Sequence, residues 1–144
     1  MGESMTVQMD AAALNAFMMR EFPQVAAEFQ VEHVASMEAD VRMLITEQHL
    51  RPGGTISGPS MFALVDLAMY AVVLAMIGPV ALAVTTNCAI DFMRKPEAGR
   101  DLIGSARLHK LGKTLAVGDV LIRSVGSDDV VARASLTYAI PPKR

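Results

Sequence analysis

The chain has 144 residues, of which 52% are apolar and 19% are charged, with a net charge of −2 and a single cysteine. This size corresponds to one ordinary domain over residues 1–144, without the basic surface of a nucleic-acid-binding protein and without a disulfide inside the chain. Because the apolar fraction exceeds what one small core needs, we expect a subunit interface to bury the surplus.

The first predicted helix spans about residues 10–20. Asp10 is a suitable N-cap, and apolar residues follow at helical spacing. Pro23 ends the helix, because the residue before a proline disfavours the helical region. No basic residue precedes an apolar run in the first ten positions, so we expect no secretory signal and a cytoplasmic protein.

Two strands are predicted next, over residues 27–36 and 39–49. In the first, Phe29, Val31 and His33 alternate with polar residues, which is the two-residue period of a strand with one buried face. The second strand repeats this pattern. The link between them is short enough for a hairpin, so we expect the two strands to pair.

A long central helix is predicted over about residues 59–77. The segment before it, RPGGTISGP, holds three glycines and two prolines in nine residues and therefore marks a loop. Pro59 suits the first helical turn, and the following residues are rich in alanine, leucine and methionine until Gly78 ends the run. With almost no polar face, this helix must be buried nearly all round.

Four further strands are predicted in the second half of the chain, separated by turns that contain glycine or proline. They cover residues 81–93, 102–110, 114–124 and 130–140. Strands that are segregated from helices indicate an α+β fold with an antiparallel sheet. A curved sheet wrapped around the central helix would bury that helix.

The central helix also has an interpretation as a membrane span, because it approaches the roughly 20 residues that cross a bilayer. Asp66 lies inside it, and an acid at the centre of a membrane is costly. Basic anchors are sparse, since the next basic residue downstream is Arg94. We therefore expect no membrane insertion.

Asp66 is the only formally charged residue between Arg51 and Asp91. Its neighbours three and four positions away along the helix are apolar or aromatic. A carboxylate in such company loses hydration and is tolerated only if it is paired or hydrogen-bonded. Asp66 is therefore a solvent-facing residue at a gap in the apolar stripe, a structural acid, or the nucleophile or general base of a pocket, and the residues alone leave these possibilities open.

Ser57-Gly58-Pro59 leads directly into the central helix, where free N–H groups and the positive end of the helix dipole lie. Such a terminus can bind a carbonyl oxygen that becomes negative during acyl transfer, and Gly58 permits a close approach. Asp66 follows eight residues later, so one helix presents an oxyanion donor and an acid at different depths. The alternative is a plain loop that ends in a Ser57 or Gly58 cap.

The remaining reactive side chains are isolated in the sequence. His33, His49 and His109 stand singly, and we expect strand or surface histidines rather than catalysts. Cys88 is expected to be a small core residue. The sequence offers no ligand set for zinc, so no metal is expected.

Four blocks carry a resemblance to a known family. They are the loop RPGGTISGP with SMFALVD after it, the strand NCAIDFMRKPEAG, the hairpin LHKLGKTLAVGDVLI and the last strand ASLTYAIP. In order and spacing they resemble the hotdog-fold acyl-CoA thioesterases of the phenylacetate-degradation type, from about residue 50 to the C-terminus. The resemblance implies a hotdog fold and a homodimer or homotetramer with its active site at the dimer interface.

The resemblance also implies a role for each matching residue. Asp66 matches the acid that attacks the thioester or activates water, Gly58 the glycine whose N–H polarises the carbonyl, and Thr85 the hydroxyl that positions the water or the acid. Arg94 and Lys113 match positions near the phosphates of coenzyme A. Coenzyme A is part of the substrate, and no separate cofactor is implied.

Three residues depart from the family pattern. Ser57 stands in place of a histidine, Pro59 in place of a glycine and Arg51 in place of an asparagine. Ser57 remains a candidate substrate contact, and Arg51 can pair with Asp66 or bind an acidic substrate tail. Two functions stay open: hydrolysis of a small or medium acyl-CoA, aromatic ones included, and binding of an acyl-CoA without cleavage.

Overall fold

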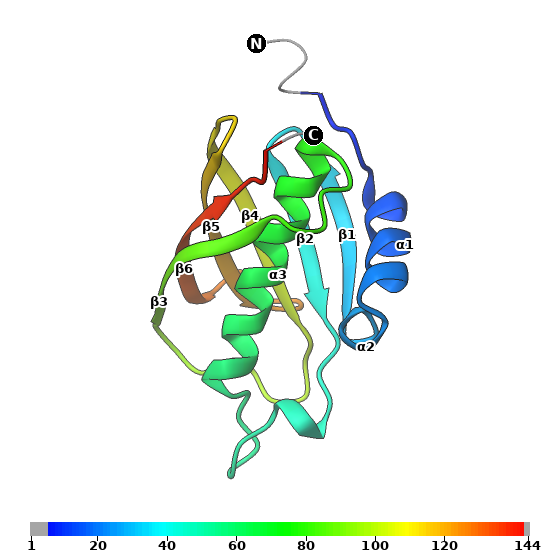
Figure 1. Cartoon of the computed structure of the whole chain (residues 1–144). Coiled ribbons are helices and arrows are strands. Elements are labelled where there is room, and N and C mark those ends of the chain that lie inside the picture. Colours follow the sequence, from blue (N-terminus) through cyan, green and yellow to red (C-terminus); the bar gives the residue numbers. More distant parts are fainter. Residues whose placement is uncertain (1–5, 143–144) are drawn as a thin grey trace.

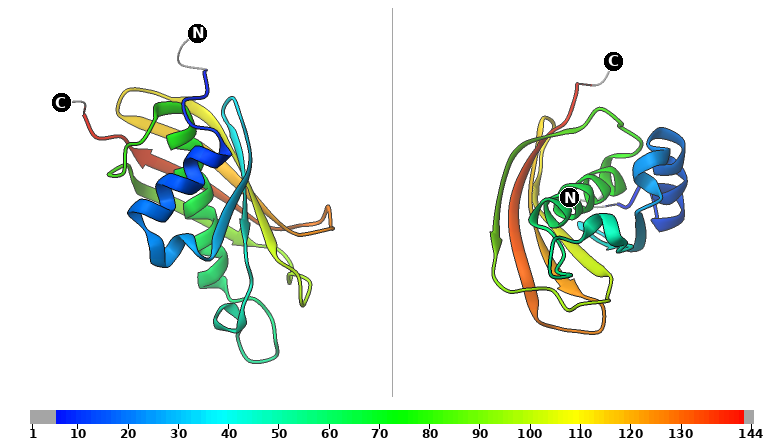
Figure 2. Two further views of the ribbon diagram at one scale, coloured as in Figure 1. Left: turned by 90° about the vertical axis from the view of Figure 1, so that its right-hand side faces the viewer. Right: turned by 90° about the horizontal axis from the view of Figure 1, so that it is seen from below.

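The computed structural model describes residues 6–142. Its elements in chain order are α1 (Ala11–Glu21), α2 (Pro23–Ala26), β1 (Phe29–Ala35), β2 (Glu38–Met43), η2 (Glu47–His49), α3 (Gly58–Ile77), β3 (Val84–Phe92), β4 (Leu102–Leu111), β5 (Leu115–Ser124) and β6 (Val130–Ala139). The strands form one antiparallel sheet in the order β1-β2-β4-β5-β6-β3. The sheet curves around α3, and α1 and α2 lie beside it (Figure 1, Figure 2). This is the predicted hotdog fold.

Helix α1 covers one edge of the sheet. It begins as predicted, with the Asp10 side chain accepting a hydrogen bond from the Ala13 N–H at 2.8 Å. Further along α1, the Asn15 side chain accepts from the Val31 N–H at 2.9 Å and donates to the Val31 carbonyl at 3.0 Å. These two bonds satisfy backbone groups of Val31 at the edge of the sheet, which a neighbouring strand would otherwise bind. Within residues 6–142, the opposite edge strand, β3, pairs with β6 alone and is open on its other side.

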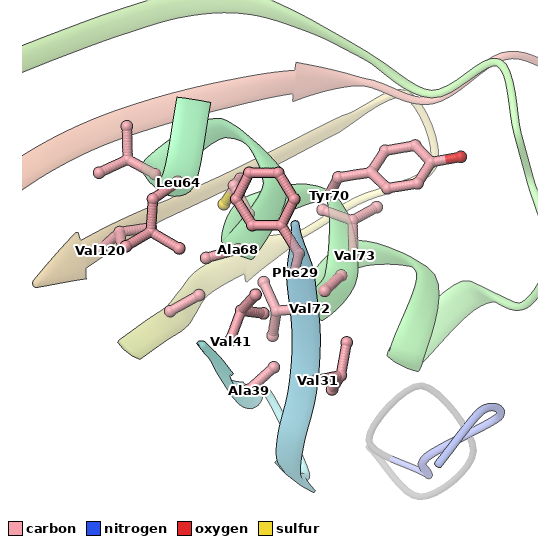
Figure 3. Close-up of a cluster of buried hydrophobic side chains, with 14 of the residues drawn as sticks. Phe29, Val31, Ala39, Val41, Leu64, Ala68, Tyr70, Val72, Val73 and Val120 are labelled. Atoms are coloured by element: carbon pink, nitrogen blue, oxygen red, sulfur yellow. The ribbon is translucent and has the colours of Figure 1, made fainter. Parts of the chain in front are cut away.

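Helix α3 packs closely on β4 and β5 because glycines face it there. A Cβ atom added at Gly104 would lie 3.1 Å from Leu64 Cγ. One added at Gly118 would lie 3.1 Å from Met69 Sδ and 2.5 Å from the Arg107 carbonyl oxygen. The buried side chains of α3 meet those of β1, β2 and β5 in one core (Figure 3). The glycines therefore set the depth at which the helix lies in the sheet.

The second strand is shorter than predicted, because β2 ends at Met43 and residues 44–49 leave the sheet. Its partner β4 begins at Leu102, directly opposite Met43, so no ladder exists beyond that pair. The Asp101 carboxylate accepts a hydrogen bond from the Ile45 N–H at 2.9 Å and holds the departing chain. In the sequence, the pattern of alternating side chains continues beyond Met43. No partner strand is available there, so the predicted strand was too long.

A β-bulge in β1 reverses the predicted orientation of His33. Val31 pairs with Val41, and His33 then pairs with Asp40, so one residue of β1 has no partner. The change of phase turns His33 onto an exposed face instead of the core face that the alternation predicted. His109 also lies exposed on a strand, which confirms its predicted place at the surface.

Helix α3 meets the length and composition of a membrane span, with 20 residues and a mean hydropathy of 2.1. In the fold, however, 67% of its apolar window is buried. The curved sheet supplies that burial, so the apolar composition is accounted for by the position of α3 at the centre of the core.

Replacing Gly118 by alanine should destabilise the fold by about 1–3 kcal/mol, the usual cost of overpacking. The added Cβ would meet the Arg107 carbonyl oxygen at 2.5 Å, so β4 and β5 would have to separate. Urea denaturation measures the change in free energy of unfolding. Ser135→Ala, at an exposed position of β6, is the control and should change it by less than about 0.5 kcal/mol. Equal stabilities for both variants would contradict the packing argument.

Candidate active site

Two strands bring hydroxyl groups to Asp66, which lies half-buried on α3. The Thr85 hydroxyl of β3 donates a hydrogen bond to Asp66 Oδ1. The Tyr138 hydroxyl of β6 lies 2.9 Å from the same oxygen and 3.0 Å from the Asp66 carbonyl oxygen. Thr85 and Tyr138 are direct partners in the β3–β6 ladder. The acid is therefore held by hydroxyl donors and not by a cation.

Sequence reasoning missed Tyr138 as part of this site. It is 2% exposed and lies on the core face of β6. Nothing in the linear sequence connects it with an acid 72 positions earlier, because only the pairing of β6 with β3 sets it beside Thr85. One signal was available: a tyrosine at an inward-facing strand position needs a hydrogen-bond partner for its hydroxyl.

A row of aromatic rings extends from Tyr138 towards the N-terminal helices. The Tyr70 ring lies 6.4 Å from the Tyr138 ring and 5.8 Å from the Phe22 ring. Burial raises the pKa of Tyr138 far above its ordinary value, and the negative charge of Asp66 raises it further. Burial raises the pKa of Tyr70 to about 12. Both hydroxyls are therefore neutral near pH 7, and Tyr138 meets Asp66 as a donor.

The start of α3 is capped by a serine. The Ser57 hydroxyl accepts a hydrogen bond from the Ser60 N–H at 3.2 Å. The Phe92 ring at the end of β3 lies against Gly58, since a Cβ atom there would be 3.4 Å from the ring. At about 1.5 Å of rise per residue, Gly58 lies about 12 Å along the helix from Asp66. Within one chain these two groups cannot contact the same reacting atom.

His49 supports the loop before α3 from a buried position. It is 3% exposed, its Nε2 lies 2.7 Å from the Glu28 carboxylate, and its Nδ1 accepts from the Thr46 N–H at 2.9 Å. Its carbonyl oxygen accepts from the Ser57 N–H at 2.8 Å. His49 therefore lies buried in η2 and not on a strand or at the surface, where it was predicted, and its hydrogen bonds anchor the start of α3.

None of the three predicted cationic residues forms an ion pair with Asp66 in the described chain. The exposed side chain of Arg51 makes no ion pair with any residue in the described range, so it does not pair with Asp66 of its own chain. Arg94 follows β3 and lies 3.6 Å from Asp129. Lys113 lies in the β4–β5 turn, at the opposite end of the sheet (Figure 1).

Cys88 lies on β3, partly buried against the core. Burial raises the pKa of its thiol, and the negative charge of Asp66 raises it further. The pKa of the Cys88 thiol therefore depends on the charge of the candidate catalytic acid. Among residues 6–142, no group of three histidine, cysteine or acidic side chains is arranged to hold a metal ion.

Comparisons with known proteins identify the family and the fold. A family model described as the thioesterase superfamily matches residues 53–131. The solved structure of a candidate thioesterase from Silicibacter sp. TM1040 is 55% identical, with 96% of each chain covered and a TM-score of 0.90. No curated protein sequence matches the chain.

Two further solved structures are of the phenylacetic acid degradation protein PaaI. A variant of the protein from Thermus thermophilus is 29% identical, with 83% of this chain and 99% of that chain covered and a TM-score of 0.71. The protein from E. coli is 27% identical, with 88% and 91% covered and a TM-score of 0.73.

Replacing Asp66 by asparagine should make Cys88 react several-fold faster with iodoacetamide near pH 8, because loss of a nearby negative charge favours the thiolate. The thiolate is the reactive form, and loss of the Asp66 charge lowers the pKa of Cys88 towards its ordinary value. Because Cys88 is the only cysteine, mass spectrometry of the whole chain reports its rate alone.

The control for this measurement is Asp91→Asn, since Asp91 lies exposed on β3 and pairs with Arg133 at 3.0 Å. It should leave the rate unchanged. At high pH, where the thiol is ionised in every variant, the rates should converge. An Asp66→Asn rate equal to that of the unmodified protein would contradict the electrostatic contact.

Proposed function

The chain belongs to the thioesterase superfamily and has the hotdog fold of the PaaI-like type, and from this we propose that it hydrolyses the thioester of a small or medium acyl-CoA. Aromatic acyl groups are included, and the products are a carboxylic acid and the free thiol of coenzyme A. One observation carries the proposal: Asp66 is held by Thr85 and Tyr138 on an otherwise apolar helix. We place this activity in the cytoplasm.

In this proposal Asp66 is the nucleophile that attacks the thioester carbon or the base that activates a water molecule. The Gly58 N–H at the start of α3 polarises the thioester carbonyl and stabilises the charge that forms on its oxygen. Thr85 positions Asp66 through its hydrogen bond. The three groups cover the functions that acyl transfer requires.

Four further side chains are proposed to bind the substrate. The Ser57 hydroxyl stands at the helix start, and Arg51, without an ion pair to the described chain, is available for an acidic group of the substrate. Arg94 and Lys113 are assigned to the phosphates of coenzyme A. Because these two lie at opposite ends of the sheet (Figure 1), they reach the same phosphate only from different subunits.

A complete site of this kind needs two copies of the chain. Gly58 and Asp66 lie about 12 Å apart on one helix, whereas groups that act on one reacting centre lie within about 3.5 Å of it. Two α3 helices that run antiparallel can bring Gly58 of one copy opposite Asp66 of the other. We therefore propose a homodimer, alone or within a homotetramer, with two sites at its interface.

The open edge of the sheet supports this interface. Exposed apolar side chains gather along β3, the residues that flank it and the adjoining face of α3: Phe62 42%, Leu82 76%, Val84 54%, Phe92 51% and Met93 47% exposed. The β3 strand of a second copy would satisfy the free backbone groups of this edge and cover these side chains. This surface accounts for the apolar surplus of the composition.

Binding of an acyl-CoA without cleavage is the second candidate function. Pro59 favours it, because a proline at the second position of α3 removes one N–H from the place where an oxyanion would bind. Removing an oxyanion donor costs about 10²–10³ in rate in other enzymes. Both candidate functions predict that the protein binds acyl-CoA. Only a measurement of turnover therefore distinguishes hydrolysis from binding alone.

A panel of acyl-CoA substrates, tested with the unmodified protein and Asp66→Asn, decides between them. We expect hydrolysis of at least one small or medium acyl-CoA and a loss of about 10²–10⁴ in kcat for the variant, because its amide can neither attack nor accept a proton. Release of free thiol measures the rate, and calorimetry measures acyl-CoA binding. Tight binding without turnover by the unmodified protein would select the binding function and overturn hydrolysis.

Replacing Val84 by lysine should separate the proposed dimer. Val84 is 54% exposed in one chain, so the change should leave the fold intact but place a charge in the interface. We expect a lower mass by sedimentation velocity and at least about a 100-fold loss of hydrolysis, because each site would lose the helix start of its partner. Leu121→Lys, 44% exposed on β5, is the matched control and should keep the dimer. An active Val84→Lys monomer would contradict the shared site.

A further inference from the structure

Both side-chain hydrogen bonds to the Asp66 carboxylate end on the same oxygen atom. Thr85 donates to Oδ1, and the Tyr138 hydroxyl lies 2.9 Å from Oδ1. Neither bond reaches Oδ2. Because one carboxylate oxygen can accept two hydrogen bonds, Oδ1 is fully engaged by these donors and Oδ2 is not needed to hold the side chain.

The second oxygen of Asp66 retains access to solvent. Oδ2 has no hydrogen-bond partner among the described residues. At the same time, no buried side-chain oxygen or nitrogen of the described residues is left without a partner. Oδ2 is therefore not buried, and it is the atom of Asp66 that a water molecule or a substrate can approach.

Tyr138 is placed to fix this asymmetry. Its hydroxyl lies between two oxygens of one residue, 2.9 Å from Asp66 Oδ1 and 3.0 Å from the Asp66 carbonyl oxygen. Its single proton is shared between these two acceptors, and the bond to Oδ1 ties the side chain of Asp66 to β6. The Tyr70 ring packs 6.4 Å from the Tyr138 ring and limits its movement.

The chemistry of Tyr138 restricts its part in the reaction. Burial, and after it the charge of Asp66, raises the pKa of the phenol, so the group is neutral near pH 7. With 2% of its surface exposed, the side chain is closed to a substrate. It can act on the reaction only through Asp66.

We propose that Tyr138 is a positioning residue that holds Oδ1 of Asp66 together with Thr85 and leaves Oδ2 as the reacting oxygen. The inference rests on the proposed hydrolysis. It adds a residue and an atom to that mechanism: the second anchor of the acid and the oxygen that attacks or takes the proton. Without the phenol, the carboxylate can rotate about its side-chain bonds, and the reacting oxygen leaves its productive position.

The test compares Tyr138→Phe with Tyr70→Phe. These are the only two tyrosines of the chain, and both are buried, but the Tyr70 hydroxyl donates to the Ala81 carbonyl at 3.2 Å and not to Asp66. Each variant loses one hydroxyl oxygen, and the two rings are neighbours, so the two changes are matched in size and location. For Tyr138→Phe we expect kcat to fall about 10- to 100-fold with KM within about twofold, in keeping with the loss of one hydrogen bond to a charged group. For Tyr70→Phe we expect both constants within about threefold.

The separation of kcat from KM is a readout that a purely structural role would not produce. A general loosening of the fold would also weaken substrate binding and raise KM, whereas loss of the Tyr138 hydroxyl changes the orientation of the Asp66 carboxylate alone. Equal kinetics for the two variants would overturn the positioning role, while the proposed hydrolysis would stand on the Asp66→Asn result.

A spectroscopic measurement keeps the inference testable apart from turnover. In protein labelled with 13C at the aspartate carboxyl groups, the Asp66 resonance is the one that Asp66→Asn removes. Its chemical shift should change in Tyr138→Phe, which removes a hydrogen bond to the carboxylate, and stay in place in Tyr70→Phe. An Asp66 chemical shift in Tyr138→Phe that matches that of the unmodified protein would overturn the inference, even for a chain that binds acyl-CoA without cleaving it.

Discussion

A carboxylate on the helix that a sheet encloses is costly unless hydrogen-bond donors replace the water that it loses. Thr85 and Tyr138 supply those donors to Asp66. Thr85 lies on β3 and Tyr138 lies on β6, and these two strands are neighbours in the sheet. In the sequence, however, β6 lies far from α3, which carries Asp66. The candidate site therefore exists only where the central helix, the edge strand and the last strand are all in place, and its integrity is tied to that of the fold.

The depth of α3 in the sheet is the second constraint on the site. Gly104 and Gly118 leave space on β4 and β5 for the side chains of the helix. Since interiors are packed about as densely as organic crystals, a small displacement of the helix would move Asp66 relative to both of its donors. Residues with no chemical part in the site thus determine the hydrogen-bond lengths within it.

The two edges of the sheet differ in a way that bears on function. The Asn15 side chain bonds to the backbone of β1 and occupies that edge, whereas β3 is open in the described chain and flanked by exposed apolar side chains. The open edge is also the strand that carries Thr85 and Cys88. Assembly and catalysis, as proposed, share one element, so a substitution on β3 is expected to affect both.

The sequence by itself determined most of the architecture. Glycine and proline marked the ends of α3, and the period of apolar residues gave the strands, because these are local properties of the backbone. The prediction was wrong where strand pairing decided the outcome: β2 ends opposite the residue at which its antiparallel partner β4 begins, and a bulge in β1 turns His33 outward. Asp66 stood out as a lone charge among apolar residues, and the resemblance to a family added Thr85. Tyr138, and the choice of Oδ1 as the held oxygen, came only from the tertiary structure, because strand pairing brings together residues 72 positions apart that no local pattern connects.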